Sequence, residues 1–567
     1  MGVAQMKKYA AWVAAWSIVF ALSAFGQSVG QKEAPSTPGG KMDELFDFWN
    51  RLDQPGFAVV VVKDGQVVTR KVYGLACQEH AVPITPNTVF NAGPVAKAFV
   101  GMAVALLEKQ GKLALDDAVR KYIPEIPDYG LPLQLRHLLY QTSGLRDWPS
   151  VLRLNGRDNE EVTFGKVLEI VKAQKRLAFT PGDRFQDSDT NYDLLAETIR
   201  RVTGQPFSDW AWENIFKPLK MTRTLFRDNY RSILDDQAFS YNYTRREYLR
   251  GIDNLSLAGS HSLFVSINDL TKWLLNLGTG AVGGPDILAK MFTAGRLNNG
   301  QGSGFGYGLN VDARTGRAQV SKIGKWAGSQ AGLAFFPDRK FGCAVLANWD
   351  YPGTEVENIL QGIIATYDPA PPEPVKKTPA AAAKKPVKVK PEKLDLYAGD
   401  YRMGPGQVFT ISRSGDQLMF GYSGTKSPLT TLSETEFLLA FAEARITFQK
   451  NKEGKVGQFV WSQGGSERIV PKVALVKPTP QELREYAGAY ANDEIGVRYI
   501  VELRGEALIL TGPGIVEARL APDERDRFTT SSRTLPMVIF ERDGQNRVAG
   551  FSIDSDAVRD LIFKRAF

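Results

Sequence analysis

The chain has 567 residues, of which 43% are hydrophobic and 23% are charged. This composition is typical of a globular protein and excludes wholesale disorder, and the length predicts about three to four domains. The net charge of +8 is largely local to one segment, so we expect no nucleic-acid partner.

Residues 1–26 have the pattern of a secretory signal peptide. Lys7 and Lys8 precede an apolar run of 17 residues, Tyr9–Phe25, and small residues stand at Ala24–Gly26. A retained membrane anchor is the alternative, because roughly 17–25 apolar residues span a bilayer. We expect cleavage, no stable membrane span afterwards, and a periplasmic or secreted protein.

The chain has too few cysteines for a disulfide framework and too few histidines for a zinc motif. Cys77 and Cys343 stand in apolar, strand-like contexts and are expected to be buried, with a disulfide as the alternative in an exported protein. The three histidines (His80, His137 and His261) are far apart and form no zinc motif. We therefore expect no metal and no cofactor.

Helical and strand patterns alternate over residues 42–368, the first predicted domain. A β-hairpin is expected at 56–76 around the turn KDGQ, and a long amphipathic helix at Pro94–Leu113. Further helices follow at 190–204 and 207–216, then strands at 305–312, 318–324 and 331–348, and a last helix at 355–368. This order predicts an α/β (α+β) domain whose antiparallel sheet is built from both ends and flanked by helices, with a helical insertion.

A linker follows at residues 369–393. It is rich in proline and alanine and holds seven lysines against two glutamates, so it carries much of the net charge. Such a self-repelling segment is expected to be an extended, solvated spacer. Contact with an anionic envelope surface is the alternative.

After the linker the chain changes to short alternating strands and repeats itself. Two pairs of segments match at an offset of about 90 residues, namely 393–420 with 482–510 and 446–463 with 538–555. Each unit has enough strands to close on itself and remove its exposed edges. We predict two small antiparallel β-barrels, 394–478 and 479–567, with one larger sandwich as the alternative.

Several segments of the first domain resemble landmarks of the serine β-lactamase and penicillin-binding-protein family, especially its class C, carboxypeptidase and esterase branch. They stand in the family's order: LRHLLYQTSGL at 135–145, PGDRFQDSDTNYDLLAETI at 181–199, VSINDLTKWLLNL at 265–277 and KIGKWAGSQAGLAFFP at 322–337. The resemblance implies the β-lactamase/transpeptidase-like fold. The three-domain layout also resembles bacterial D-aminopeptidases, in which a barrel loop reaches the active site.

The family's chemistry uses Ser-x-x-Lys at a helix start, Tyr-x-Asn on a loop and Lys-Thr-Gly on a strand. The resemblance places Gly93–Lys97, Asp187–Asp189 and Lys322–Gly324 at these motifs. The pocket positions that it implies are Pro94, Lys97, Asp187, Asp189, Lys322 and Gly324.

Pro94 stands where the family has its nucleophilic serine. Proline has no hydroxyl, thiol or free amine in mid-chain, although it suits a first helical turn. Asp187 is a poor substitute for the tyrosine, because its carboxyl normally titrates near pH 4. Ser188 and the separate match SGTK at 423–426 are weak candidates for a replacement nucleophile. We therefore assign no catalytic residue and expect a pseudoenzyme.

The resemblance implies that Lys97, Asp187, Asp189 and Lys322 converge. Two lysines and two aspartates balance in charge, so we expect a salt-bridged relic pocket. The alternatives are side chains that are solvated separately, and two carboxylates that bind a cation.

The expected function follows from two features: the fold that the resemblance implies, and a proline where the family has its nucleophilic serine. We expect an exported protein that binds a small-molecule or peptide ligand, or cell-wall fragments, through Lys322, Gly324 and the strand edge after them. An active serine hydrolase (D-aminopeptidase, esterase or weak β-lactamase) with an unidentified nucleophile is the alternative. The third possibility is a purely structural role, in which the barrels and not the large domain are the functional part.

Overall fold

The structure is a computed structural model. It describes residues 36–244, 247–312, 318–351, 355–369, 389–404, 407–422, 425–442, 444–451, 454–463, 466–530, 532, 534–553, 558 and 561–566. The expected signal peptide and most of the expected linker lie outside these residues. Within them, every helix is too short or too polar to cross a bilayer.

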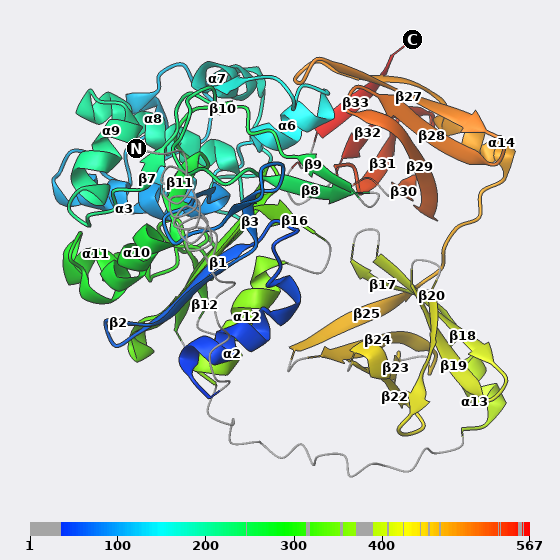
Figure 1. The fold of residues 1–567 in the computed structure, drawn as a ribbon. Helices are drawn as coiled ribbons and strands as arrows, with labels where there is room; N and C mark the ends of the chain where they lie inside the picture. The colour runs from blue at the N-terminus through cyan, green and yellow to red at the C-terminus, as the bar shows by residue number, and fades with distance from the viewer. Residues whose placement is uncertain are drawn as a thin grey trace, which may run out of the picture.

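A six-stranded antiparallel sheet forms the centre of the large domain (Figure 1). Its order is β12 (Asn310–Asp312), β13 (Gln319–Trp326), β14 (Ser329–Phe336), β15 (Phe341–Ala347), β1 (Phe57–Lys63) and β2 (Gln66–Tyr73). The expected hairpin is β1 with β2, and β1 also pairs with β15 from the far end of the domain. The prediction of one sheet built from both ends is confirmed.

Helices cover both faces of this sheet, which explains the continuous apolar run in β1. Ala58 and Val60 belong to the core cluster on the face of α3 and α10, whereas Val59 and Val61 belong to the cluster on the face of α2 and α12. The helices are α2 (Pro38–Leu45), α3 (Ala96–Lys109), α4 (Val119–Tyr122), α5 (Leu135–Leu139), α6 (Trp148–Leu154), α7 (Phe164–Ala173), α8 (Asp189–Thr203), α9 (Phe207–Ala211), α10 (Ile267–Thr279), α11 (Gly284–Met291) and α12 (Val356–Tyr367).

Short strands join the helical insertion to the rest of the domain. They are β3 (Leu75–Cys77), β4 (Val82–Pro83), β5 (Val89–Asn91), β6 (Val162–Thr163), β7 (Thr224–Phe226), β8 (Tyr241–Thr244), β9 (Glu247–Arg250), β10 (Leu255–Ser256), β11 (Leu263–Ser266) and β16 (Trp349–Asp350). One of them, β5, leads directly into the turn that begins α3, and β11 holds it in place by antiparallel pairing.

Two antiparallel barrel-like sheets follow, as predicted. The first has nine strands in the described residues: β17 (Gly399–Gly404), β18 (Gln407–Ser414), β19 (Gln417–Tyr422), β20 (Thr425–Pro428), β21 (Thr430–Thr431), β22 (Glu436–Leu439), β23 (Ala444–Lys450), β24 (Val456–Gln463) and β25 (Ser466–Val473). The second is a closed barrel of β26 (Gly488–Asn492), β27 (Val497–Arg504), β28 (Ala507–Gly512), β29 (Ile515–Glu524), β30 (Arg527–Thr529), β31 (Met537–Arg542), β32 (Val548–Ile553) and β33 (Leu561–Ala566). One larger sandwich is thereby excluded.

The internal repeat is visible in equivalent hydrogen bonds. A short helix precedes each barrel, α13 (Pro391–Asp395) and α14 (Pro480–Leu483). In the first unit the Tyr401 hydroxyl donates to the Tyr397 carbonyl at 2.8 Å, and in the second the Tyr490 hydroxyl donates to the Tyr486 carbonyl at 2.7 Å. Each bond fixes the entry of the chain into the first strand of its barrel.

Two elements differ from the prediction. The expected strand at 305–312 is limited to Asn310–Asp312, because its first half turns against the start of α3. Gly308 has φ +83°, and a Cβ atom there would lie 2.0 Å from the Lys97 carbonyl oxygen. The expected helix at Pro94–Leu113 is α3 preceded by a 3-10 turn, Gly93–Val95, and ends at Lys109.

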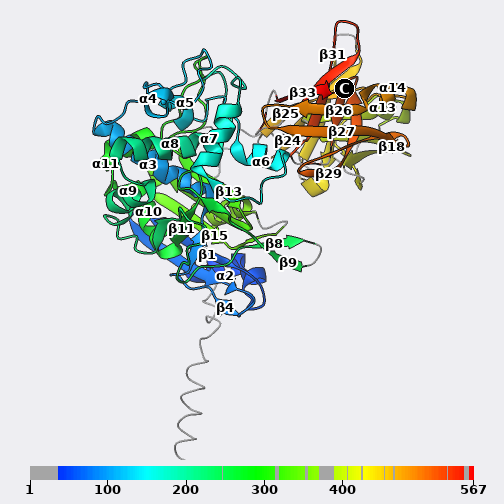
Figure 2. The ribbon, with the colours of Figure 1, turned by 90° about the horizontal axis from the view of Figure 1, so that it is seen from above.

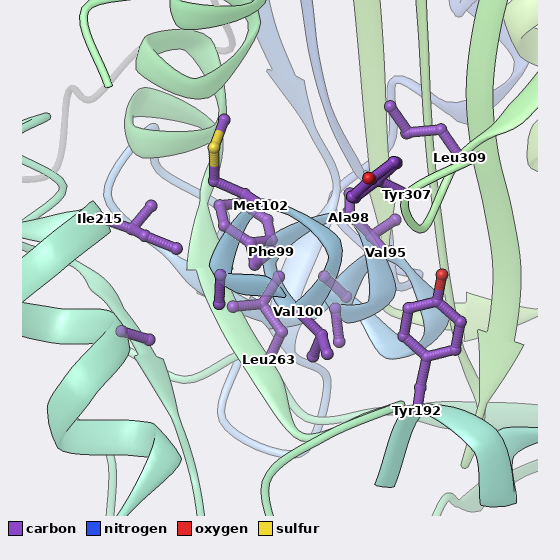
Figure 3. Close-up of a cluster of buried hydrophobic side chains, with 14 of the residues drawn as sticks. Val95, Ala98, Phe99, Val100, Met102, Tyr192, Ile215, Leu263, Tyr307 and Leu309 are labelled. Atoms are coloured by element: carbon purple, nitrogen blue, oxygen red, sulfur yellow. The ribbon is translucent and has the colours of Figure 1, made fainter. Parts of the chain in front are cut away.

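Buried hydrophobic side chains surround α3 (Figure 3). Phe99 packs against Trp273 of α10, with ring centroids 4.2 Å apart, and against Phe216 at 5.5 Å. Nearly every side chain of α3 is buried, including Lys97. The position of the Lys97 ammonium is therefore set by the packing of the whole helix.

Candidate functional site

The site begins at the 3-10 turn Gly93–Val95, which faces the edge of β13. Strand β12 pairs only with Gln319–Ser321, so the edge from Lys322 onward faces this turn. A Cβ atom at Gly324 would lie 2.3 Å from Cγ of Pro94. Gly324 therefore lets the proline ring lie directly on the strand, at the position that the resemblance assigns to the nucleophilic serine.

Lys97 forms two ion pairs behind Pro94. Its ammonium lies 2.5 Å from Oδ1 of Asp187 and 2.9 Å from Oδ1 of Asp189. Only 1% of Lys97 is exposed. Burial alone would lower the pKa of Lys97, but the two carboxylates outweigh it and hold this pKa well above its ordinary value. The two carboxylates therefore favour the ammonium form of Lys97 at neutral pH.

Lys322 approaches the same carboxylate from the sheet. Its Nζ lies 3.3 Å from Oδ2 of Asp187, and 2% of the residue is exposed. Burial of the amine and repulsion by Lys97 outweigh the attraction of Asp187, so the pKa of Lys322 is below its ordinary value. Lys97 and Lys322 share Asp187 as a partner, but the pKa of Lys97 is raised and the pKa of Lys322 is lowered.

The structure brings together the six positions that the motifs place in the pocket. The two lysines are buried rather than solvated separately, whereas 48% of the Asp187 side chain is exposed. Lys97 and Lys322 together hold the pKa of Asp187 below its usual range, although burial opposes them. The cluster is a nearly neutral network that presents one carboxylate to solvent.

Three further side chains complete the network, and motif placement did not identify them. Gln141, at φ +59°, donates from Nε2 to Oδ1 of Asp187 at 2.7 Å. His261 Nδ1 lies 3.6 Å from Oδ2 of Asp189, and burial lowers the pKa of His261. Asp147 accepts from the Asp189 backbone N–H at 2.9 Å. In the sequence, the only indication of Gln141 is its place in LRHLLYQTSGL, a segment that resembles a family landmark.

Asp147 is a buried carboxyl directly behind the cluster. It also caps α6 by accepting from the Ser150 backbone N–H at 3.2 Å. Burial, with the repulsion of Asp189, raises the pKa of Asp147 to about 7. This carboxyl therefore exchanges its proton near neutral pH and changes the charge beside Asp189.

The second barrel is joined to this region through α6. Val151 and Leu154 of α6 belong to the same hydrophobic cluster as the interior of the barrel. The Tyr499 hydroxyl donates to the Leu154 carbonyl at 2.5 Å, and a Cβ atom at Gly514 would lie 1.9 Å from the Arg153 carbonyl oxygen. Figures 1 and 2 show the barrel beside α6 in both views.

A buried ion pair ties the barrel to the site. Arg146 precedes Asp147 and pairs through Nε with Oε1 of Glu494, a residue of the second barrel. The exposed fractions of the two side chains are 2% and 11%. The Arg146 carbonyl in turn accepts from Oγ1 of Thr190, the neighbour of Asp189, at 2.7 Å. The barrel thus supports the segment that holds the carboxylates of the cluster.

Glu494→Gln is expected to lower the free energy of unfolding by about 1.5–3 kcal/mol, because it removes a charged hydrogen bond to a buried guanidinium. Urea unfolding followed by circular dichroism measures this change. The matched control is Glu502→Gln in the same barrel, whose pair with Arg504 is about half exposed. That variant is expected to cost less than about 1 kcal/mol. Equal costs would contradict a structural role of the buried pair.

The remaining sequence candidates take no part in these ion pairs. Cys77 and Cys343 are free and buried, so the alternative of a disulfide is wrong. Lys426 of the SGTK match lies in strand β20, and Ser423 lies outside the described residues. Ser188 is buried, and its Oγ has no hydrogen-bond partner within the described part of the chain. Among those same residues, no three His, Cys, Asp or Glu side chains gather as a metal ion would require.

Comparison with known proteins places the chain in a family. The family model described as Beta-lactamase matches residues 44–367, and a second model, Domain of unknown function (DUF3471), matches residues 383–470. D-aminopeptidase of Gluconobacter oxydans is 25% identical over 536 residues, which cover 91% of this chain and 96% of the relative. Penicillin-binding protein 4* of Bacillus subtilis is 24% identical over 454 residues, which cover 76% and 98%.

Solved structures agree on the fold. The octameric penicillin-binding protein homologue from Pyrococcus abyssi superposes with a TM-score of 0.54 at 21% identity, over 83% of this chain and 97% of the other. The matched landmarks, the six-stranded sheet and the family model all point the same way. The chain belongs to the beta-lactamase family.

Proposed function

We propose that this protein binds peptide or cell-wall-like ligands in the bacterial envelope without acyl-serine chemistry. The observation that carries the proposal is the packing of Pro94 on Gly324, beside a Lys97 whose ammonium is held by two carboxylates. The resemblance assigns the position of Pro94 to the nucleophilic serine. This position has no hydroxyl that could attack a carbonyl, and no free base that could activate such a hydroxyl.

Three further observations support the ligand class and the location. The relatives that span most of the chain are named as a D-aminopeptidase and a penicillin-binding protein. The edge of β13 after Lys322 is the strand edge that the resemblance assigns to ligand contact. The apolar run near the start of the chain supports export.

Incubation with a fluorescent penicillin and with a fluorophosphonate tests the loss of chemistry. We expect the intact mass to stay unchanged with both reagents, because both must be attacked by an activated nucleophile. Stoichiometric labelling of any serine would overturn this half of the proposal.

Calorimetric titration with a peptide that ends in D-Ala-D-Ala tests binding. We expect saturable binding that Lys322→Met abolishes and Lys325→Met leaves unchanged. Lys325 is the matched control, because it lies on the same strand but pairs with Asp350 at 2.7 Å near the surface. Equal loss of binding in the two variants, or no binding by the native chain, would exclude this ligand class at the site.

An active hydrolase is the second candidate function. The D-aminopeptidase relative covers 91% of the chain, and Ser188 carries a buried hydroxyl next to Asp187 and Asp189. Ser188→Ala distinguishes the two functions: labelling by the fluorophosphonate that this variant abolishes would identify Ser188 as the replacement nucleophile.

A further inference from the structure

We propose that a cavity between α8, α9 and the segment after β10 binds small organic cations, namely amines that carry an aromatic or alkyl group. The inference goes beyond the proposed function, because the cavity is lined by neither Lys97 nor Lys322. It stands on the cavity itself, on its apolar walls and on the charge of the side chains that line it.

The cavity has a volume of about 260 Å³. One water molecule takes up about 30 Å³ of the liquid, so this volume has room for a small organic molecule. Phe164 at the start of α7, Phe207 of α9 and Leu257 form apolar walls. Pro206 and Asp228 also line the cavity and are exposed, so a ligand can enter it from solvent.

The lining carries an excess of negative charge. Among the described residues, three acids and one cation line the cavity: Asp193, Glu197, Asp228 and Arg200. The cation is not free, because Arg200 donates from Nε and Nη2 to the two carboxylate oxygens of Glu197, each at 2.7 Å. Asp228 accepts from Ser208 Oγ at 2.9 Å and forms no ion pair with another described residue. Negative charge beside apolar walls attracts an organic cation and repels an anion.

Asp193 is the most deeply buried acid of the lining, with 1% of the residue exposed. Its Oδ2 accepts from Trp148 Nε1 at 2.6 Å and its Oδ1 accepts from the Ser260 backbone N–H at 2.7 Å, so neutral donors hold it in place. A carboxylate has about four acceptor sites, so sites remain for an ammonium ion in the cavity. Burial raises the pKa of Asp193 to about 7, which agrees with a carboxyl that lies beside no cation of its own.

Ligand-observed NMR titration of the full chain at pH 8 tests the inference. Benzylamine, benzyl alcohol and benzoate share one ring and differ in charge. We expect saturable binding of benzylamine and no binding of benzoate. Benzyl alcohol is expected to bind at least about ten-fold more weakly than benzylamine, because it makes no charged hydrogen bond. Equal binding of the three compounds, or no binding of benzylamine, would overturn the proposal.

Two variants locate the binding site. Asp228→Asn is expected to weaken benzylamine binding about two- to five-fold, the range of one exposed ion pair. The matched control is Asp209→Asn, which changes an exposed acid of α9 outside the lining and is expected to leave binding unchanged. Ala258→Leu fills the cavity and is expected to abolish binding, with the melting temperature as the check of folding. Undiminished binding by Asp228→Asn or by folded Ala258→Leu, or an equal loss in Asp209→Asn, would overturn the proposal, and these results are independent of whether peptides bind at Lys322.

Discussion

Pro94→Ser alone is expected to leave the protein unlabelled by a fluorescent penicillin, whereas Pro94→Ser with Asp187→Tyr and Asp189→Asn is expected to acquire measurable labelling. The single change supplies a hydroxyl, but Lys97 remains an ammonium ion held by two carboxylates. In the triple variant both carboxylates are gone, so burial lowers the pKa of Lys97 and an amine becomes available as a base.

The matched control carries alanine instead of serine at position 94 beside the same two changes. It has the same altered electrostatics and lacks only the hydroxyl, so it is expected to stay unlabelled. Gel fluorescence and intact mass measure the stoichiometry. Equal labelling of the single and triple variants would show that the ion pairs do not disable Lys97. A folded but unlabelled triple variant would show that the pocket has changed beyond these three positions.

Much of the fold follows from the periodicity of the sequence. The run FAVVVVK has no polar face, and β1 accordingly is buried on both sides between the cores of α3 and α12. The alternating strands after the linker, and their repeat, likewise predicted two barrel-like sheets. Residues 305–309 were misassigned because glycine-rich segments satisfy a strand pattern, while their path depends on the close contact of Gly308 with Lys97.

The candidate site was predictable only where motifs mark it. Lys97, Asp187 and Lys322 occupy recognisable positions, and charge balance indicated their pairing. The Arg146–Glu494 pair joins residues that are 348 positions apart, and nothing in either local segment indicates the partner. Because Arg146 and Tyr499 are buried between the large domain and the second barrel, this barrel supports the segment that holds the cluster.

Lys97→Met is expected to be the most destabilising single change in the cluster. It leaves Asp187 and Asp189 near each other without their shared cation, and removal of one partner of a buried ion pair costs about 3–5 kcal/mol. Urea unfolding at pH 7 measures the loss. The matched control is Lys325→Met, whose partner and own side chain are 34% and 47% exposed, and it is expected to cost less than about 1 kcal/mol.

The cost of Lys97→Met is also expected to shrink as the pH falls from 7 to 5, and the sign follows from the pKa shifts. In the native chain the folded pKa of Lys97 is raised, so its stabilisation is complete at and below neutral pH and is lost only as the pH rises through that value. The folded pKa of Asp187 is lowered, so its stabilisation persists above the ordinary pKa near 4.

In the variant the buried Asp189 carboxylate loses its ammonium partner, and its folded pKa is expected to rise above the unfolded value. The folded variant then binds a proton that the unfolded chain does not, so its stability increases as the pH falls through this raised pKa. The difference between native chain and variant is therefore largest at neutral pH. A cost that is independent of pH between 5 and 7 would mean that lost packing of the lysine stem, rather than unpaired carboxylates, dominates the effect.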